Sequence, residues 1–270
     1  PIVVNDNRNH NFDRGLYSEF GRLGLLGSTV KNHGGAGASS AAYGLIAYEM
    51  EKIDSSYRSS ISVQSSLVIH PINSFGSESQ KDKYLPNLIS GKKIGCFGLT
   101  ESEAGSDPSS MKTTYKKNQH GYVLNGIKNW ITNAPVSDVF IIWALNDKLE
   151  TNSIKGFILD KGTKGLSTSA IENKTSLKIS PTGQIIMQNV SIDKFNCLEN
   201  TEGWSSVFSC LNKARFGISW GVLGAASECW LIAKDYAENR IMFKKPLAAN
   251  QLIQKKLDLA KNRMYCNYAF

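Results

Sequence analysis

The chain has 270 residues, of which 41% are hydrophobic and 10% aromatic, and this composition excludes an intrinsically disordered protein. Its net charge of +8 would suit an anionic partner, but the lysines are scattered and not interleaved with aromatic residues, so we expect no nucleic-acid-binding surface. No apolar stretch approaches the length that spans a bilayer, so we also expect no membrane insertion.

Residues 1–94 show the apolar spacing of helices. A Gly-rich loop precedes a run of apolar residues spaced by three and four, and Ser39 or Ser40 is placed to cap that helix. Another helix is expected to begin at Ser79 and to end or bend at Pro86. The Gly-rich loop is not a dinucleotide fingerprint, because no strand precedes it, so we interpret it as a flexible turn.

Residues 95–200 show the spacing of strands. Asn125-Gly126 lies between two strand-like runs and predicts a β-hairpin, because this pair readily adopts the positive φ angles of a tight turn. The apolar run from Val139 to Leu145 has the length of a buried strand. Further strands are expected at residues 155–160 and 184–192.

Residues 201–270 return to a helical pattern. Gly217, Gly221 and Ala225 recur every four residues, which lets another helix backbone approach closely. The three patterns together predict an α+β fold. We expect an N-terminal helical domain (residues 1–94), a middle β-barrel or sandwich domain (95–200) and a C-terminal helical bundle (201–270).

The spacing of cysteines and histidines does not favour metal or redox chemistry. The five cysteines form no CxxC pair and indicate free thiols in a reducing compartment. The four histidines lack metal-ligand spacing. We therefore expect no metal site.

The segment from Cys96 to Pro108 carries the most specific chemistry. An apolar strand runs into hydroxyls, carboxylates and glycine, an order that exposes backbone N–H groups beside Thr100 and Ser106. Such a turn can hold the polar edge of a ring together with a phosphate. Further along the chain, Trp130 supplies an aromatic face beside a hydroxyl, suited to lie against a flat heterocycle.

These motifs resemble the acyl-CoA dehydrogenase family. The similarity lies in Phe97-Gly-Leu-Thr-Glu with Gly105-Ser-Asp, in Trp130-Ile-Thr, and in Arg240-Ile-Met-Phe followed by Gln251, and it extends to about Lys256. It implies a non-covalent FAD and a homo-oligomer, usually a homotetramer, in which Arg240 and Gln251 contact the FAD of a neighbouring subunit. The flavin residues that it implies are Phe97, Leu99, Thr100, Gly105, Ser106, Trp130, Ile131, Thr132, Arg240, Phe243 and Gln251.

Within the family, the segment that begins Tyr57-Arg-Ser-Ser is similar to the part of glutaryl-CoA dehydrogenases that meets the distal carboxylate of the substrate. Arg58 can grip a carboxylate through two parallel hydrogen bonds. Glu51 would orient Arg58 if the helical phase persists between them. A solvated arginine is the alternative interpretation.

A second acyl-CoA segment is implied by Phe208, Asn212 and Arg215, which share one helical face. The alternative there is an amphipathic helix with a core phenylalanine. The full set of substrate residues that the resemblance implies is Arg58, Ser59, Ser62, Ser106, Phe208, Asn212 and Arg215.

The implied reaction is the FAD-dependent oxidation of glutaryl-CoA to crotonyl-CoA and CO2 in lysine and tryptophan degradation, with electrons passed to electron-transfer flavoprotein. Another short- or branched-chain acyl-CoA dehydrogenase is the first alternative, and a truncated, inactive fragment that binds flavin or acyl-CoA is the second. The family's catalytic glutamate finds no match in the chain, and Glu101 and Glu103 belong to the flavin motif. We therefore expect no catalytic residue and no activity in these residues alone. The expected compartment is the mitochondrial matrix, or the cytoplasm of a bacterium.

Overall fold

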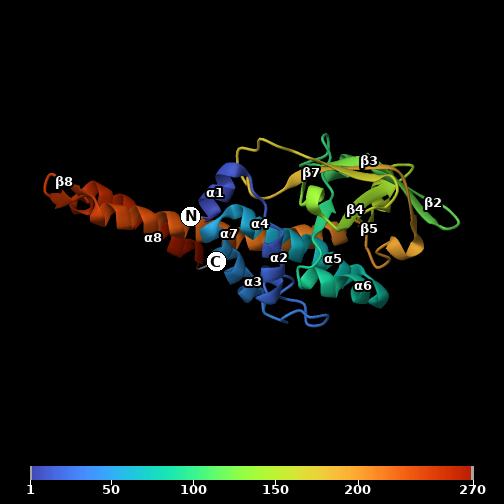
Figure 1. Cartoon of the computed structure of the whole chain (residues 1–270), viewed down its shortest axis with the longest axis horizontal. Coiled ribbons are helices and arrows are strands. Elements are labelled where there is room, and N and C mark those ends of the chain that lie inside the picture. Colours follow the sequence, from blue (N-terminus) through green and yellow to red (C-terminus); the bar gives the residue numbers. More distant parts are fainter. Residues whose placement is uncertain (1, 269–270) are drawn as a thin grey trace.

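The computed structural model describes residues 2–268, so the outer ends of the expected domains 1–94 and 201–270 lie outside it. A β-domain lies at one end of the molecule, helices pack beside it, and a long helical hairpin extends to the other end (Figure 1). The fold is α+β, as expected.

Side-chain caps explain where two of the N-terminal helices begin. Ser39 accepts a hydrogen bond at Oγ from the N–H of Ala42 (3.2 Å), which confirms it as the cap of α3. Ser77 and Gln80 form a capping box at the start of α6. Pro86 lies inside α6, so of the two outcomes expected there the helix does not end at the proline. The helices are α1 (Ile2–Asn9), α2 (Gly15–Arg22), α3 (Ser40–Ile53), α4 (Ser55–Ser62), α5 (His70–Phe75) and α6 (Glu78–Ile89).

A π-helical segment, η1 (Val63–Ile69), joins α4 to α5 in one buried helix. Pro71 follows it, and proline lacks an N–H and crowds the carbonyl four residues earlier. A regular α-helical hydrogen-bond ladder is therefore interrupted there. Such wider turns occur often at functional sites.

The middle domain is a seven-stranded sheet in the order β1-β4-β2-β3-β7-β6, with β5 paired to β4. β4 is buried on both faces, which confirms the strand expected from its apolar run. Phe140 and Ile142 enter the core of the β-domain, whereas Ile141 and Trp143 pack in the core shared with the helices. The strands are β1 (Gly95–Gly98), β2 (Thr114–Lys117), β3 (Gly121–Thr132), β4 (Val139–Asn146), β5 (Lys155–Asp160), β6 (Leu166–Ala170) and β7 (Thr182–Asp193).

The hairpin expected at Asn125-Gly126 was wrong. Both residues lie inside β3, where the pairing with β7 shifts register between Leu124 and Gly126. Gly126 has a φ of 146°, and a Cβ there would lie 2.7 Å from the Cα of Thr113. Glycine therefore serves a bulge and a close backbone approach at this point instead of a turn.

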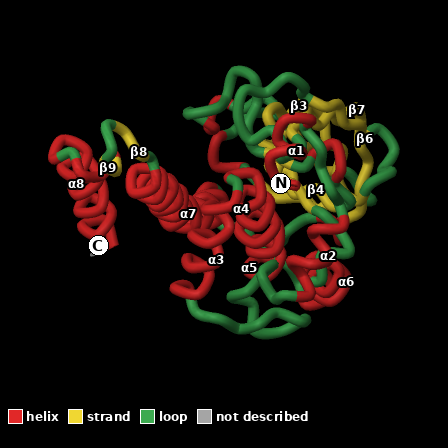
Figure 2. The backbone as a smooth tube through the Cα atoms, turned by 60° about the vertical axis from the view of Figure 1, so that its left-hand side comes forward, coloured by secondary structure: helices red, strands yellow, loops and turns green. Residues whose placement is uncertain are grey.

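The C-terminal part begins with α7 (Trp204–Asn239), which passes beside α3 and α4 and continues outward (Figure 2). Gly217, Gly221 and Gly224 are buried there, and a Cβ on Gly224 would lie 2.0 Å from the carbonyl oxygen of Tyr48. The close approach of another helix backbone expected from the spacing occurs at Gly224, whereas Gly217 and Gly221 face the side chains of Tyr43 and Glu51. After the short strands β8 (Ile241–Met242) and β9 (Lys245–Pro246), α8 (Gln251–Tyr268) returns along α7.

α7 has 36 residues and is long and apolar enough, by length and composition alone, to cross a membrane. The expectation that no segment reaches that length was therefore wrong. The core helix of a soluble protein passes the same test, so the finding is weak evidence for a membrane.

Candidate functional site

The two flavin motifs expected from the sequence lie side by side. The loop that follows β1 meets β3, where the N–H of Asn129 donates to the carbonyl oxygen of Thr100 (2.8 Å). The side-chain amide of Asn129 also donates to Oγ of Ser102 (3.1 Å). Gly105 and Ser106 are exposed at the end of this loop, and within the described chain their backbone N–H groups make no hydrogen bond.

A second irregularity in β3 turns Trp130 outward. The register with β7 shifts between Lys128 and Ile131, and Trp130 takes a φ of 59°. Its side chain is 60% exposed, which is unusual for a tryptophan, whereas Ile131 beside it is buried. The bulge therefore presents the indole at the surface of the β-domain.

Trp130 lines two hollows. One of about 170 Å³ is bounded by the π-helical segment, the end of β1, the bulge of β3, and α7. Another of about 440 Å³ continues from Trp130 and Thr132 along the loop before β7. The smaller hollow is lined by Val63, Leu67, Phe97, Leu99, Thr100, Trp130, Ile131, Thr132 and Leu211.

Arg58 and Glu51 form an ion pair through Nε and Oε2. The pair is nearly buried, with 12% and 6% of the two side chains exposed. Helical phase does not bring them together, because α3 ends at Ile53 and Asp54 is extended before α4 begins. Among the described residues, no hydrogen bond engages the two terminal nitrogens of Arg58.

The neighbours of this pair on its own helix are serines. Ser62 follows Arg58 by one helical turn and is followed at once by Val63, which lines the smaller hollow. Ser59 and Ser62 are buried. A tyrosine of α3 reaches the same helix, since Tyr43 Oη lies 2.7 Å from Oγ of Ser66.

The residues expected to contact acyl-CoA on α7 share one exposed face. Phe208 is 42% exposed, and Arg215 donates through Nη1 to Oδ1 of Asn212 (2.9 Å). Lys213, which lies between Asn212 and Arg215 in sequence, is half-buried and donates to Oγ1 of Thr29 (2.9 Å). Phe208, Asn212 and Arg215 are exposed, whereas Lys213 is not.

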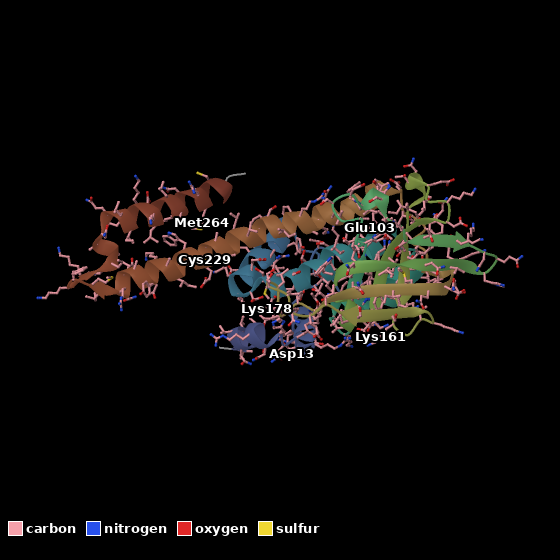
Figure 3. All side chains as sticks on the ribbon, turned by 90° about the horizontal axis from the view of Figure 1, so that it is seen from above. Asp13, Glu103, Lys161, Lys178, Cys229 and Met264 are labelled. Carbon is pink, nitrogen blue, oxygen red and sulfur yellow. The ribbon has the colours of Figure 1, made fainter. Side chains whose placement is uncertain are left out.

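The last three expected flavin residues lie far from Trp130. Arg240, Phe243 and Gln251 are exposed around the turn that joins α7 to α8, at the end of the molecule opposite the β-domain (Figure 1). The hairpin, in which Cys229 and Met264 are labelled, extends away from the main body (Figure 3). Within one chain the structure does not bring these residues to the flavin motifs.

Sequence reasoning missed a buried ion pair beneath the loop between β1 and β2 (residues 99–113), which carries the first expected flavin motif and is called the flavin loop below. Lys128 is completely buried and donates through Nζ to Oε1 of Glu101 (2.8 Å) and to the carbonyl oxygen of Leu99 (2.9 Å). Burial lowers the pKa of Lys128 to about 8, although Glu101 favours its charged form. Burial would raise the pKa of Glu101, but Lys128 holds it below its ordinary value. One feature of the sequence could have revealed this pair: Lys128 occupies a position of the predicted strand whose side chain faces inward.

His70 links α5 to α7 near the exposed face of Phe208, Asn212 and Arg215. Its Nε2 lies 3.0 Å from Oγ of Ser209, and its Nδ1 lies 3.2 Å from Oγ of Ser74. Burial, followed by the nearby charge of Lys213, lowers the pKa of His70 to about 4. The imidazole is therefore neutral at physiological pH.

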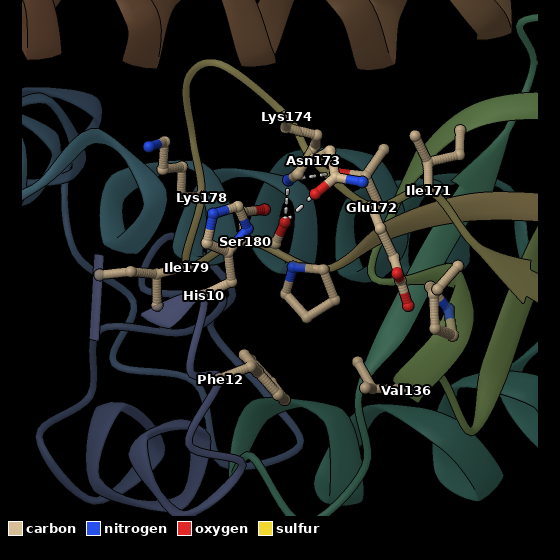
Figure 4. Close-up of a pocket in the computed structure, with 14 residues that line it drawn as sticks. His10, Phe12, Val136, Ile171, Glu172, Asn173, Lys174, Lys178, Ile179 and Ser180 are labelled. Carbon is tan, nitrogen blue, oxygen red and sulfur yellow. Dashed lines mark hydrogen bonds between the residues drawn. The ribbon is translucent and has the colours of Figure 1, made fainter. Parts of the chain in front are cut away.

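A further hollow of about 420 Å³ lies between the N-terminal segment and the loop before β7 (Figure 4). Lys174 holds this loop by donating to the carbonyl oxygens of Leu177 (2.8 Å) and Ser180 and to Oγ1 of Thr182 (2.9 Å). His10 and Phe12 of the N-terminal segment also line the hollow. None of the site residues expected from the sequence lines this hollow.

Three family models match consecutive parts of the chain. They are described as the N-terminal domain (residues 1–92), the middle domain (96–190) and the C-terminal domain (201–265) of acyl-CoA dehydrogenase. The last match extends beyond Lys256, where the sequence resemblance was expected to end.

Individual relatives agree with these matches. An acyl-CoA dehydrogenase of Bacillus subtilis is 38% identical over 90% of this chain, which spans 65% of that relative's length. The crystal structure of a glutaryl-CoA dehydrogenase from Mycobacterium smegmatis in complex with FADH2 is similar with a TM-score of 0.93 and 39% identity, over 97% of this chain and 67% of that one. The structure of butyryl-CoA dehydrogenase from Megasphaera elsdenii is similar with a TM-score of 0.93 and 34% identity, over 98% of this chain and 71% of that one.

Proposed function

The chain belongs to the acyl-CoA dehydrogenase family, and on that premise we propose that the protein containing it oxidises glutaryl-CoA, the CoA thioester of a short dicarboxylic acid. The proposed products are crotonyl-CoA and CO2, in the degradation of lysine and tryptophan. The observation that carries the substrate class is the buried pair of Arg58 and Glu51.

FAD is the cofactor, and the structure offers a surface that fits it. Trp130 is a large aromatic side chain held outward by a bulge, and it lines two hollows. A Cβ on Gly105 would meet no atom within 4 Å, so the loop end is open to a ligand. We propose that Phe97, Leu99, Thr100, Gly105, Ser106, Trp130, Ile131 and Thr132 hold the flavin. When bound, FAD supplies the hydride acceptor, while the chain supplies orientation and a water-poor setting.

Arg58 is proposed to bind the distal carboxylate of the substrate. Glu51 occupies its Nε, so the two terminal nitrogens retain the parallel geometry that a carboxylate needs. Because the Arg58 side chain is nearly buried, its attraction to a carboxylate is stronger than it would be in water. Ser62, one turn further along the helix, is proposed to add a hydroxyl, and Ser59 to support the same end.

The CoA moiety is proposed to lie along α7. Phe208, Asn212 and Arg215 form an exposed face on which an apolar side chain lies beside an amide and a cation. A phosphate-bearing ligand suits such a face because guanidinium binds phosphate oxygens in a planar fork. Ser106, exposed at the end of the flavin loop, is proposed to contact the thioester side of the same ligand.

No residue of this chain is proposed as the base that removes the α-proton. The smaller hollow beside Trp130 is lined by no carboxylate. Glu101 is engaged by Lys128, and Glu51 by Arg58. Activity is therefore proposed for the whole protein, and we expect the 270-residue chain alone not to turn over.

We also propose an electron acceptor, an assembly and a compartment for the whole protein. Electron-transfer flavoprotein is the proposed electron acceptor, and a homotetramer the proposed assembly, in which Arg240, Phe243 and Gln251 reach the FAD of a neighbouring subunit. Their position far from Trp130 in one chain supports that role. The proposed compartment is the mitochondrial matrix, or the cytoplasm if the protein is bacterial, because the chain is similar to dehydrogenases of both kinds.

A straight-chain short acyl-CoA is the second candidate substrate. The butyryl-CoA dehydrogenase structure is as similar in fold as the glutaryl-CoA dehydrogenase, and the smaller hollow is mostly apolar. Flavin absorbance during anaerobic titration of the whole protein with glutaryl-CoA and butyryl-CoA separates the two. Bleaching at lower concentration of glutaryl-CoA is expected, and bleaching by butyryl-CoA alone would favour the second candidate.

A further inference from the structure

A buried ammonium group beneath the flavin loop has no role in binding any ligand proposed above. Lys128 is fully buried and lines none of the hollows beside Trp130. Charged side chains are almost never fully buried unless they are paired, because desolvation is costly. The contacts of Lys128 therefore indicate the role of this buried charge.

These contacts join three segments of backbone. Lys128, in the bulged part of β3, donates to the carbonyl oxygen of Leu99 (2.9 Å), which follows β1. Its partner Glu101 accepts hydrogen bonds from the backbone N–H groups of Lys112 (2.7 Å) and Thr113 (3.0 Å), which immediately precede β2. The two carboxylate oxygens and the ammonium thus tie both ends of the flavin loop to the strand that carries Trp130.

We propose that Lys128 and Glu101 are positioning residues that fix the flavin loop relative to the Trp130 bulge, and so set the geometry and affinity of the flavin site. The loop is otherwise tied to the bulge through Asn129, which bonds to Thr100 and Ser102. Trp130 itself has the strained φ of 59°, which persists only where its surroundings determine it. The lowered pKa of Lys128 is consistent with the cost of holding a cation there.

The alternative is that the pair of Lys128 and Glu101 only stabilises the fold. The two roles predict different results when both residues are replaced by uncharged ones. Replacing both members of a buried ion pair by uncharged groups is often neutral for stability, whereas removing one member leaves a buried charge unpaired. If the pair only stabilises the fold, replacing both residues should therefore preserve stability and FAD affinity together. If the pair positions the loop, replacing both should still weaken FAD binding, because the hydrogen bonds to Leu99, Lys112 and Thr113 set where the loop lies.

The test compares Lys128→Met, Glu101→Gln and the double variant in the whole flavoprotein. The readouts are the dissociation constant of FAD, the visible spectrum of the bound flavin, and the melting temperature of the FAD-free protein. The matched controls are Lys116→Met and Asp147→Asn, because these residues form an exposed ion pair (4.0 Å) outside that loop.

We expect the FAD dissociation constant to rise at least tenfold in Lys128→Met, and to stay raised in the double variant while its melting temperature recovers. The controls should stay within twofold of the parent protein. Recovery of FAD affinity together with melting temperature in the double variant, or affinity that follows melting temperature in every variant, overturns the proposal. If Lys128→Met does not fold, Glu101→Gln decides by the same FAD readout. The inference rests on the flavin site of the proposed function and not on the substrate, so substrate preference does not affect its outcome.

Discussion

Arg58 donates through Nε to Oε2 of Glu51 although a helix break at Asp54 separates the two residues. The turn at Asp54 folds α4 back so that a carboxylate near the end of α3 braces a guanidinium on the next helix. Gly221 of α7 covers the pair, since a Cβ there would lie 2.7 Å from Oε2 of Glu51. The cation proposed to select the substrate is therefore held by both α3 and α7.

Glu51→Gln should weaken the recognition of glutaryl-CoA more than that of butyryl-CoA. The amide still accepts a hydrogen bond from Arg58, but it no longer fixes the guanidinium by charge. Steady-state kinetics with both substrates should show KM for glutaryl-CoA raised about tenfold, or ~1.4 kcal/mol, with kcat nearly unchanged. Equal increases in KM for both substrates would argue that Glu51 acts only on overall structure.

Gly221→Ala should reduce the preference for glutaryl-CoA while the protein still folds. The added methyl group would meet the flexible ends of Glu51 and Arg58, which can move, and not the backbone. Gly224→Ala is the matched comparison, because its methyl group would meet the Tyr48 carbonyl oxygen at 2.0 Å and should destabilise the fold. Melting temperatures and the ratio of kcat/KM values measure both effects. An unchanged ratio in Gly221→Ala would contradict the role of the pair in specificity.

Trp130→Phe should weaken FAD binding about fivefold. The smaller ring keeps the bulge but loses aromatic contact, and an aromatic pair contributes roughly 0.5–1.5 kcal/mol beyond its buried area. Trp204→Phe serves as control, because Trp204 lies at the start of α7 and donates to the carbonyl oxygen of Thr151. Fluorescence titration with FAD measures the dissociation constant. The same affinity in Trp130→Phe and the parent protein would remove Trp130 from the flavin site.

Stability should fall with acidification through the titration of His70. Its folded-state pKa of about 4 lies below the ordinary 6.5, so the unfolded chain binds one more proton between these values. The free energy of unfolding should therefore decrease as pH falls from about 6.5 to about 4. Urea unfolding across this range should show a shallower pH dependence in His70→Gln than in the parent protein. The exposed His120→Gln should leave that dependence unchanged, and an unchanged slope in His70→Gln would contradict the assignment.

The order of helical, β and helical parts followed from the sequence, because apolar period reports which faces a segment buries. Val139 to Leu145 was recognisable as a strand for the same reason. Asn125-Gly126 was misread, because a glycine with unusual φ serves a bulge as well as a turn, and only the partner strand decides between them.

The site was predictable where its residues are close in sequence or belong to a known motif. Glu51 and Arg58 were expected to pair, but through a continuous helix that the structure does not contain. The contact of Lys128 with Glu101 crosses 27 positions between β3 and the loop after β1. Nothing in either segment specifies that partner, because the pairing depends on how the strands pack.

The ratio of kcat/KM for glutaryl-CoA to kcat/KM for butyryl-CoA, measured in the whole flavoprotein and in its Arg58→Ala variant, tests the proposed substrate most directly. Removing one partner from a buried charged contact costs roughly 2–5 kcal/mol. We expect the parent protein to prefer glutaryl-CoA and the variant to lose about 100-fold in that ratio, with FAD still bound. A ratio that Arg58→Ala leaves unchanged would contradict the recognition of a dicarboxylic acyl-CoA by this chain.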